Sequence, residues 1–234
     1  MSKSDKEYQR NYQRDKNRKG YRKSKKGIGF YLPSGTVVYV LDILEHGKVI
    51  SEDQKWIHKP LIQAIETPGF NLFEMEYNRD KNIQLQEKIT IQKGSDSKVG
   101  KVIHRLTFNK LTQTSKDLIQ NTIELHVKDQ EQLYVNFLNN AGPITKKRHS
   151  LNLIPGIGEK SMWDILKARE IKKFESFEDF EKRTGIKDIA VLISKRILNE
   201  IIDDQAKHYL FVKRKAMTQQ SQKDSSPSKR TYPK

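Results

Sequence analysis

The spacing of apolar residues changes once along this chain, near Thr112, and that change limits the folds open to it. Before this point, short apolar runs alternate with polar residues, which is the two-residue period of half-buried strands. After it, apolar residues recur every three or four positions, which is the period of amphipathic helices. The sequence therefore predicts an α+β protein with its strands first and its helices second.

Five strand-like stretches lie between residues 35 and 109. They read T-V-V-Y-V-L-D-I-L, P-L-I-Q-A-I-E, F-N-L-F-E-M-E-Y, I-Q-L-Q-E-K-I-T-I and K-V-I-H-R-L-T-F. Turn signals rich in Gly, Pro, Asn and Asp separate them. Five short strands with such turns favour a small closed barrel over residues 29–111, of which the OB-like barrel is one common form. An SH3-like barrel fits the same pattern.

A helical stripe follows, and we expect residues 112–142 to form a connecting helix. Thr114 or Ser115 is a suitable N-cap, because a short hydroxyl side chain accepts a hydrogen bond from a free amide of the first turn. We expect a break in this helix near Asp129. Gly142 and Pro143 end the pattern for steric reasons and mark the start of a second domain at residues 143–212.

The stretch L-I-P-G-I-G-E-K at residues 153–160 is the clearest motif. Proline and two glycines permit a tight turn that leads directly into a helix, and Ile157 is suited to pack between the helices on either side. Free amides and the positive dipole end make a helix N-terminus an anion site, to which Lys160 adds a charge. The pattern resembles the hairpin of helix-hairpin-helix proteins, which implies phosphate contact by Gly156, Ile157, Gly158 and Lys160.

Two neighbouring features extend this motif. Lys146, Lys147 and Arg148 precede the turn, and we expect them either to flank the same phosphate or to form a solvated helix face. The stretch F-E-S-F-E-D-F-E-K-R-T-G-I-K-D-I resembles the connecting helix and second hairpin of a tandem unit, with Gly185 and Lys187 in its turn. The second glycine of the pattern is missing there, so we expect this hairpin to bind phosphate weakly or to be structural.

Aromatic residues of the strand region allow two interpretations. The candidates for a platform that stacks on single strands, with supporting cations, are Phe70, Phe73, Tyr77, Phe108, Lys101 and Arg105. Core packing is the preferred interpretation for most of the aromatic residues, since Phe73, Met75 and Tyr77 share one face of a strand and an entirely apolar face points inward. The histidines show no ligand spacing, so we expect neither a metal site nor a cofactor.

The positive charge is concentrated at the two ends. The net charge of +16 favours a polyanionic partner, either nucleic acid or an acidic membrane surface. Residues 1–28 carry 11 basic and three acidic side chains, and residues 213–234 carry seven and one. Both segments lack the apolar residues that a core needs, so we expect two disordered basic arms. In the first arm Arg10, Arg14, Arg18 and Arg22 recur every four residues, as in segments that fold on RNA; a solubilising or localising tail is the alternative.

Two features that the sequence lacks indicate the cellular compartment in which we expect the protein. The chain has no cysteine, which excludes disulfides and thiolate metal sites and is compatible with a reducing compartment. No apolar run approaches the ~20 residues of a membrane-spanning helix, and the first residues lack the apolar segment of a signal peptide. We therefore expect a cytoplasmic protein that is not inserted in a membrane.

The body of the chain, residues 35–212, is similar to the archaeal family known as domain of unknown function 655. The stretches that carry the similarity are V-Y-V-L-D-I-L, A-G-P-I-T-K-K-R-H-S-L-N-L-I-P-G-I-G-E-K-S-M-W-D-I-L and F-E-S-F-E-D-F, in this order. The resemblance implies an OB-like barrel followed by an all-helical helix-hairpin-helix domain, and a role in RNA binding. The long basic arms look like an addition to the family body.

These features favour a non-catalytic nucleic-acid-binding protein that prefers RNA to DNA and acts at the ribosome or in RNA processing. A DNA repair enzyme is one alternative, because DNA glycosylases place a catalytic lysine at the position of Lys160 and an aspartate further along, near Asp179. We interpret Asp179 instead as part of the connecting helix between two hairpins. A protein-docking adaptor whose arms alone touch RNA is the other alternative.

Overall fold

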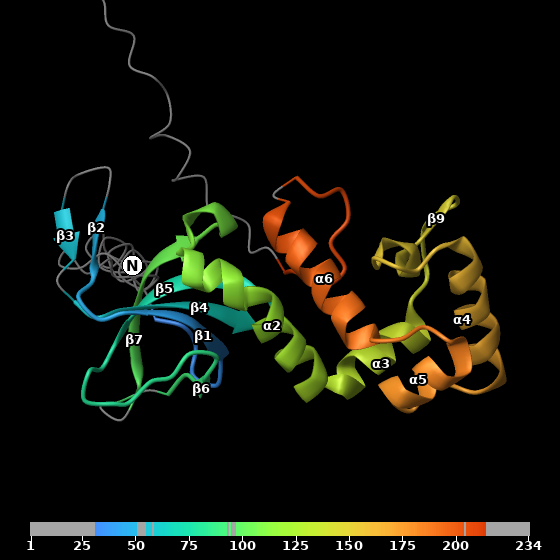
Figure 1. Ribbon diagram of the computed structural model, residues 1–234, viewed down its shortest axis with the longest axis horizontal. Helices are drawn as coiled ribbons and strands as arrows, with labels where there is room; N and C mark the ends of the chain where they lie inside the picture. Colours follow the sequence, from blue (N-terminus) through green and yellow to red (C-terminus); the bar gives the residue numbers. More distant parts are fainter. Residues whose placement is uncertain are drawn as a thin grey trace, which may run out of the picture. The chain divides into compact units, whose positions relative to one another are not determined.

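The computed structural model describes residues 31–50, 55–57, 59–92, 94, 97–203 and 205–213. The first basic arm, with Arg10, Arg14, Arg18 and Arg22, lies outside the described residues, and so do residues 214–234. The described chain is a mixed α+β structure with five helices and a five-stranded antiparallel sheet (Figure 1). The strands of this sheet precede the helices in sequence, as the apolar spacing predicts.

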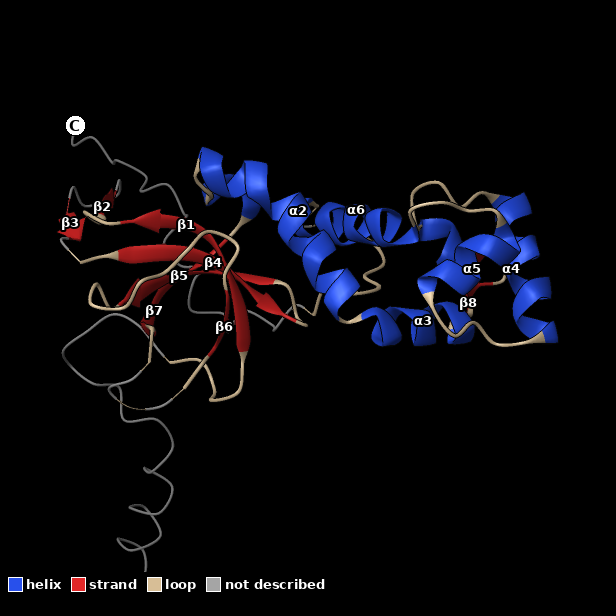
Figure 2. Ribbon diagram, turned by 60° about the horizontal axis from the view of Figure 1, so that its bottom comes forward, coloured by secondary structure: helices blue, strands red, loops and turns tan. Residues whose placement is uncertain are grey.

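Each strand of the sheet overlaps one of the five predicted stretches. The strands are β1 (Val37–Leu44), β4 (Leu61–Thr67), β5 (Asn71–Tyr77), β6 (Lys88–Thr90) and β7 (Val99–Leu106). Their order in the sheet is β6-β1-β4-β5-β7, and every neighbouring pair is antiparallel (Figure 2). The prediction of these five strands is therefore confirmed.

The sheet is open. β6 and β7 form its two edges, and in the described part of the chain no ladder of hydrogen bonds joins them. β6 is three residues long, although the sequence predicts a longer strand there. The chain turns just before it, where Gln86 has a φ of +62° and the Glu87 carboxylate accepts a hydrogen bond from the amide of Gln84 at 3.0 Å. Local turn chemistry thus shortens one edge strand, and the expected closed barrel is not found.

Both faces of the sheet are covered, which explains the unbroken apolar run V-V-Y-V-L in β1. Successive side chains of a strand point to opposite faces. Val38 and Val40 accordingly enter a hydrophobic cluster formed by the strand region, whereas Tyr39 and Leu41 enter a second cluster that continues into all five helices. The sheet and the helices therefore share one core.

The five helices are α2 (Gln113–Asp129), α3 (Glu131–Asn140), α4 (Glu159–Ile171), α5 (Phe177–Thr184) and α6 (Ile189–Ile202). The break expected near Asp129 is confirmed, since Gln130 separates α2 from α3 with non-helical angles. The predicted N-cap of α2 is wrong by two or three residues. Thr112 is the cap, and its Oγ1 accepts a hydrogen bond from the amide of Ser115 at 3.2 Å. Thr112 is held there by the sheet, because its own amide donates to Oε1 of Gln63 at 2.9 Å.

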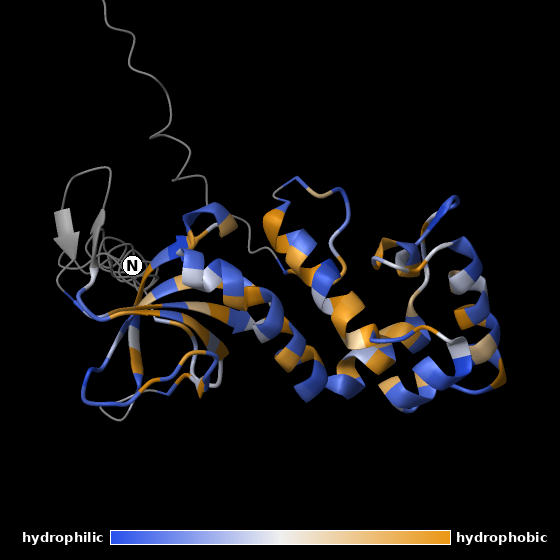
Figure 3. Cartoon of the chain, in the orientation of Figure 1, coloured by the Kyte–Doolittle hydropathy of each residue, from blue (hydrophilic) through white to orange (hydrophobic). Residues whose placement is uncertain are grey.

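α6 is the most apolar of the five helices (Figure 3). Ile189, Ile193, Ile197 and Ile201 recur every four residues along it, and all four are buried. This spacing places them on one side of the helix, which packs into the shared core. α6 therefore forms part of the rigid support on which the neighbouring helices lie.

Two short hairpins were not expected from the sequence. The first pairs β2 (Lys48–Ile50) with β3 (Lys55–Ile57), and the second pairs β8 (Pro143–Thr145) with β9 (Arg148–His149). A 3₁₀ helix, Ser150–Leu153, follows the second hairpin and precedes α4. The sequence predicts helix on both sides of the Pro155 turn, so the helical prediction before the turn is wrong except for this single short turn.

Two arginines hold α4 in place. Arg169, within the helix, donates to the carbonyl oxygen of Leu138 in α3 at 3.0 Å. Arg183 of α5 donates to the carbonyl oxygens of Ala168 and Lys172 at the C-terminal end of α4, at 2.5 and 2.7 Å. The carbonyl of Ala168 also accepts from the amide of Lys172 at 3.3 Å, whereas that of Lys172 lies at the helix end, where carbonyl groups lack intrahelical partners. Contacts at the C-terminal end of α4 thus help to fix the position of the helix and of the turn before it.

Candidate functional site

A tight turn leads from the 3₁₀ helix into α4. The amide of Ile157 donates to the carbonyl oxygen of Ile154 at 3.1 Å, with Pro155 and Gly156 between them. Gly156 has a φ of +88°, which is the conformation that a type II turn requires after proline. Ile157 is buried in the shared core, as expected from the motif. The P-G-I-G stretch therefore forms the predicted turn, with its isoleucine as an anchor.

The two glycines of this turn have different roles. A Cβ on Gly156 would lie 3.4 Å from both methyl groups of Leu192, in a backbone conformation that L residues rarely adopt. Gly156 is thus required by the fold. Gly158 has extended backbone angles, φ −79° and ψ −177°, and no heavy atom lies within 4 Å of an added Cβ. No contact of the described residues requires glycine at this position.

The N-terminal turn of α4 is open to solvent. Gly158 is its N-cap and no side chain caps it. Within the described residues, the backbone N–H groups of Glu159, Lys160 and Ser161 have no recorded acceptor. By contrast, side-chain oxygens of Thr112, Ser176 and Glu181 accept hydrogen bonds from the first turns of α2, α5 and α6. Free amides at the positive end of a helix are suited to bind an anion.

A basic hairpin lies beside this helix start. Lys146, Lys147 and Arg148 are exposed at the turn between β8 and β9, so the expected helix face is wrong. All three line a cavity of about 470 Å³, together with Glu159 and Trp163 of α4. Lys160 is exposed at the same end of the helix but does not line this cavity. The chain thus brings the three cations of the hairpin next to the first turns of α4.

His149 lines the same cavity but adds little positive charge. Burial, and then the nearby charge of Arg169, lower the pKa of His149 below its usual value. Its Nδ1 accepts a hydrogen bond from the amide of Leu151 at 3.2 Å, which caps the 3₁₀ helix. The imidazole is therefore neutral at pH 7, and the charge of the cavity comes from its lysine and arginine side chains and from Glu159.

The turn before α6 differs from the first one. Gly185 has a φ of +72° and ends α5, and Lys187 is exposed in the turn. Oε1 of Glu181 accepts a hydrogen bond from the amide of Ile189, the first residue of α6, at 3.0 Å. A carboxylate of the chain itself therefore occupies the helix start at the second turn. Weak phosphate binding at this turn stays a prediction.

None of the six candidates of the strand region lines this cavity. Phe73 is 5% exposed and lies in the strand cluster with Met75, against which Tyr77 packs, so the core interpretation is correct for these residues. Lys101 lies over the ring of Tyr31 at 5.8 Å. Arg105 donates a hydrogen bond to the side-chain oxygen of Asn71. A buried Phe73 is not available for stacking, and both cations have partners within the strand region.

By residue type, Trp163, Ile165 and Leu166 of α4 are expected in the core in preference to stacking on a base, and the structure places Trp163 at the surface instead. Trp163 is 54% exposed, whereas Met162 and Ile165 are buried. Successive residues of a helix are rotated by about 100°, so a residue next to Met162 is turned away from the buried side. The helical spacing of Met162, Ile165 and Arg169 indicates that Trp163 is exposed. The general tendency of tryptophan to be largely buried predicts the opposite.

Asp179 has a local structural role. Its carboxylate accepts hydrogen bonds from Arg183 at 3.0 Å and from the amide of Glu175 at 3.2 Å. Desolvation acts against its charged form, but these two hydrogen bonds leave the pKa of Asp179 below its usual value. Its backbone amide donates to Oγ of Ser176, the N-cap of α5. These contacts fix the start of α5.

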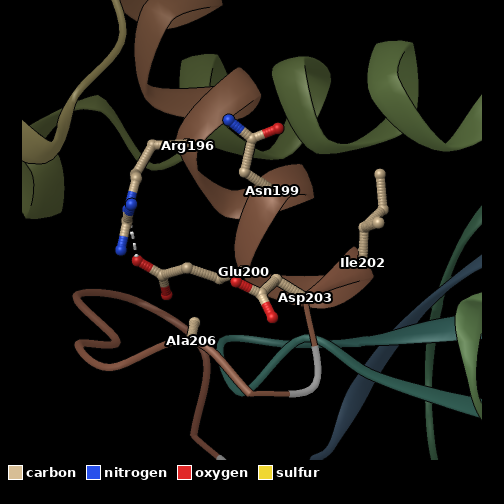
Figure 4. A pocket seen from close by; sticks show the side chains of 6 residues that line it. All are labelled: Arg196, Asn199, Glu200, Ile202, Asp203 and Ala206. Atoms are coloured by element: carbon tan, nitrogen blue, oxygen red, sulfur yellow. Dashed lines mark hydrogen bonds and ion pairs between the residues drawn. The ribbon is translucent and has the colours of Figure 1, made fainter.

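A smaller cavity of about 290 Å³ lies beside α6, and Figure 4 shows its lining. Glu200, which is 1% exposed, accepts hydrogen bonds from Nε of Arg196 at 2.7 Å and from the backbone amides of residues 210, 211 and 212. Arg196 also donates to the carbonyl oxygen of His208 at 2.6 Å. These bonds fasten the segment after α6 to the helix, so the pair is structural.

In the described residues, no group of three or more His, Cys, Asp or Glu side chains is arranged to hold a metal ion. No helix in the same part of the chain has both the length and the apolar character needed to cross a membrane.

The fold and the site define an α+β protein in which a basic hairpin adjoins the start of a helix. The chain belongs to the family described as "Protein of unknown function (DUF655)", whose sequence model matches residues 34–213. The expected similarity to this family is therefore confirmed.

Two archaeal relatives support the family. The chain is 40% identical over 176 residues to the "Uncharacterized protein MJ0038" of Methanocaldococcus jannaschii, in a match that covers 75% of this chain and 78% of the relative. It is also similar to the crystal structure of Af1531 from Archaeoglobus fulgidus, a member of the same family. That match has a TM-score of 0.69 and 36% sequence identity, and covers 76% of this chain and 99% of the other.

Proposed function

We propose that this protein binds nucleic acid without catalysis, and that the start of α4 contacts a phosphate of the backbone. The Pro155 turn and α4 then act as the hairpin of a helix-hairpin-helix unit, and the sheet as an incomplete OB-like barrel. RNA is the preferred partner, at the ribosome or in an RNA-processing complex. The preference for RNA is supported by the arginine spacing in residues 1–28, which lie outside the described residues.

The observation that carries this proposal is the contrast between the two turns. Glu181 occupies the helix start at the second turn, while the described residues provide no side-chain acceptor at the first. An oxyanion that accepts two or three amide hydrogen bonds is a strong and common ligand of such a helix start. A phosphate at this position accepts hydrogen bonds from the amides of Glu159, Lys160 and Ser161, for which the described residues provide no acceptor.

The open space at Gly158 supports the same ligand. Neither the backbone angles nor the neighbours of Gly158 require glycine. A bare Cα lets a bulky group approach the backbone closely, which a side chain at this position prevents. A phosphate that rests on the amides just after Gly158 needs this space.

The charges around the site act in opposite directions. Lys146, Lys147, Arg148 and Lys160 favour a phosphate, and Glu159 opposes it. The body between the two basic arms is close to neutral, so the arms provide most of the long-range attraction. We infer that the α4 site sets the position of the strand on the protein more than the affinity. Backbone phosphate contacts fix register in this way without reading sequence.

The proposal is tested by the affinity of the full chain for single-stranded RNA, duplex RNA and duplex DNA across a range of salt concentrations. Gly158→Val fills the space that the phosphate needs, and we expect it to weaken binding roughly tenfold at a salt concentration that screens the arms. Gly142→Val is the matched control, because Gly142 also has no heavy atom near an added Cβ and does not start a helix. Equal affinities of the two folded variants would contradict the phosphate contact.

The same experiment separates the alternatives. An adaptor whose arms alone touch RNA loses no affinity in Gly158→Val. A repair enzyme releases a base or nicks damaged duplex DNA, and loses this activity in Lys160→Ala. We expect neither product from the unmodified protein.

A further inference from the structure

Trp163 is a large hydrophobic side chain that is exposed on α4. It lies in the second turn of α4, and 54% of its surface is accessible. Among the described residues, no ring or cation is recorded against its indole. Exposed indole surface is unfavourable in water and is common where a partner covers it.

The surroundings of this indole show what kind of partner fits. Trp163 and Arg148 line the same cavity of about 470 Å³, and Met162 and Leu166 give it an apolar portion. This volume lies within the range of pockets that hold small flat ligands. The basic turn of the β8–β9 hairpin supplies Lys146 and Lys147 at the same cavity. The occupant therefore needs a flat apolar face together with negative charge.

A nucleotide with an unpaired base has both properties. Every base has a π-face that stacks on an aromatic side chain, and every nucleotide carries a phosphate for the cations. In a duplex the base faces are covered by their neighbours and are not available to an aromatic side chain from the protein. The distance along α4 also fits, because about 1.5 Å of rise per residue places Trp163 about 7 Å from Gly158 along the helix axis. One nucleotide spans this distance.

We propose that the cavity beside α4 takes an unpaired nucleobase, stacked on Trp163, while the basic turn of the β8–β9 hairpin holds the adjoining phosphate. The partner is thus a single-stranded segment or a loop. This inference rests on the proposed function and deepens it, because a phosphate contact alone does not distinguish single strands from duplexes.

The first test uses the fluorescence of Trp163. The chain has two tryptophans, so Trp56→Phe leaves Trp163 as the only one. We expect a single-stranded oligonucleotide to quench this fluorescence, since stacking brings the base against the indole. A blunt duplex of the same length and an inorganic polyphosphate are expected to leave it unchanged. Quenching by the duplex and the single strand alike would overturn the stacking. Single-stranded RNA and DNA of one sequence, measured side by side, distinguish the two sources of the base.

The second test uses the full chain without the Trp56 change. Trp163→Leu is expected to weaken single-strand binding roughly five- to 160-fold, the usual cost of losing one stacked base, and to leave duplex binding unchanged. Trp163→Phe keeps an aromatic face and should retain most of the affinity. Ile171→Ala is the control, because Ile171 is 87% exposed on the same helix and does not line the cavity.

The results separate this inference from the proposed function. If Gly158→Val weakens binding and Trp163→Leu does not, the phosphate contact stands and the stacking is overturned. If Trp163→Leu weakens single-strand binding and Gly158→Val does not, the stacking is supported and the α4 phosphate contact is overturned. If neither variant changes the affinity, both are overturned.

Discussion

The carboxylate of Glu181 accepts a hydrogen bond from the backbone N–H of Ile189 at 3.0 Å, so the turn before α6 contains an anion that the chain itself supplies. The turn before α4 has no such carboxylate within the described residues, and its N-cap Gly158 is extended, whereas Asp188, the N-cap of α6, is left-handed. The two helix starts thus differ in backbone geometry and in whether a carboxylate of the chain accepts from the first amide. We propose that a ligand accepts from the free amides of α4.

This difference predicts a cost to stability without a cost to binding at the second turn. Glu181→Ala removes the acceptor from the start of α6, and we expect a loss of about 1 kcal/mol in the free energy of unfolding, as for other N-terminal caps. Affinity for nucleic acid should stay the same. Urea unfolding and binding assays measure the two effects. Glu170→Ala is the control, because it changes an exposed glutamate of α4 and should alter neither stability nor affinity. A drop in affinity for Glu181→Ala at unchanged stability would contradict our assignment.

Glu159 provides a test in which binding improves. It is exposed in the first turn of α4, where its negative charge opposes a phosphate on the neighbouring amides. Two unit charges about 4 Å apart in water interact by about 1 kcal/mol, so Glu159→Gln is expected to strengthen binding a few-fold at low salt. The gain should shrink as salt is added. Glu170→Gln, at the other end of the helix, is the control. Equal gains from both variants would indicate a general charge effect and no bound phosphate at α4.

The basic turn and the second hairpin are distinguished by the salt dependence of binding. Each phosphate neutralised on a single strand contributes about 0.7 to the slope of log affinity against log salt. We expect Lys146→Gln to reduce the slope by up to this amount. Lys187→Gln should leave it unchanged, because Lys187 lies at the turn where Glu181 occupies the helix start. Equal reductions would show that both turns contact phosphate.

Local signals in the sequence were sufficient for much of the fold. The alternation of apolar residues located all five strands of the sheet, and Pro155 with Gly156 located the turn before α4, because these signals depend on a few neighbouring residues. The N-cap of α2 could not be located from local signals. The local pattern favours Thr114 or Ser115 as the N-cap. Thr112 is the cap because of a hydrogen bond to Gln63, which lies 49 positions away in the sequence and is not part of any local pattern.

The candidate site was predicted in part. The turn and its basic neighbours were recognised, but Lys146, Lys147 and Arg148 were expected on a helix. They lie on a hairpin that is closed at its base by the hydrogen bond from Oγ of Ser150 to the carbonyl oxygen of Gly142 at 2.8 Å. The exposure of Trp163 follows from its angle to Met162 around α4. The residue type alone predicts a buried tryptophan, and only the helical spacing around Met162 indicates an exposed one.

A buried histidine joins the sheet to the helices. His126 of α2 makes edge contacts with the rings of Tyr39, Phe70 and Tyr134, at centroid distances of 5.7, 5.5 and 6.3 Å. Both of its ring nitrogens are buried and have no hydrogen-bond partner among the described residues. Burial lowers the pKa of His126 to about 4, while Asp129 raises it and Lys88 lowers it to smaller extents. The folded state therefore holds a neutral imidazole.

This histidine predicts a stability that falls with acid. The unfolded chain takes up a proton near the ordinary pKa of about 6.5, whereas the folded chain does so only near 4. Stability is therefore full above about pH 6.5 and is lost progressively as the pH falls toward 4, by about 3 kcal/mol in all at 1.36 kcal/mol per unit. His126→Phe keeps the ring contacts and removes the proton site, so urea unfolding of this variant should depend less on pH across that interval. His46→Gln, which changes an exposed histidine, should follow the unmodified chain. If His126→Phe kept the full pH dependence, the loss would belong to other groups.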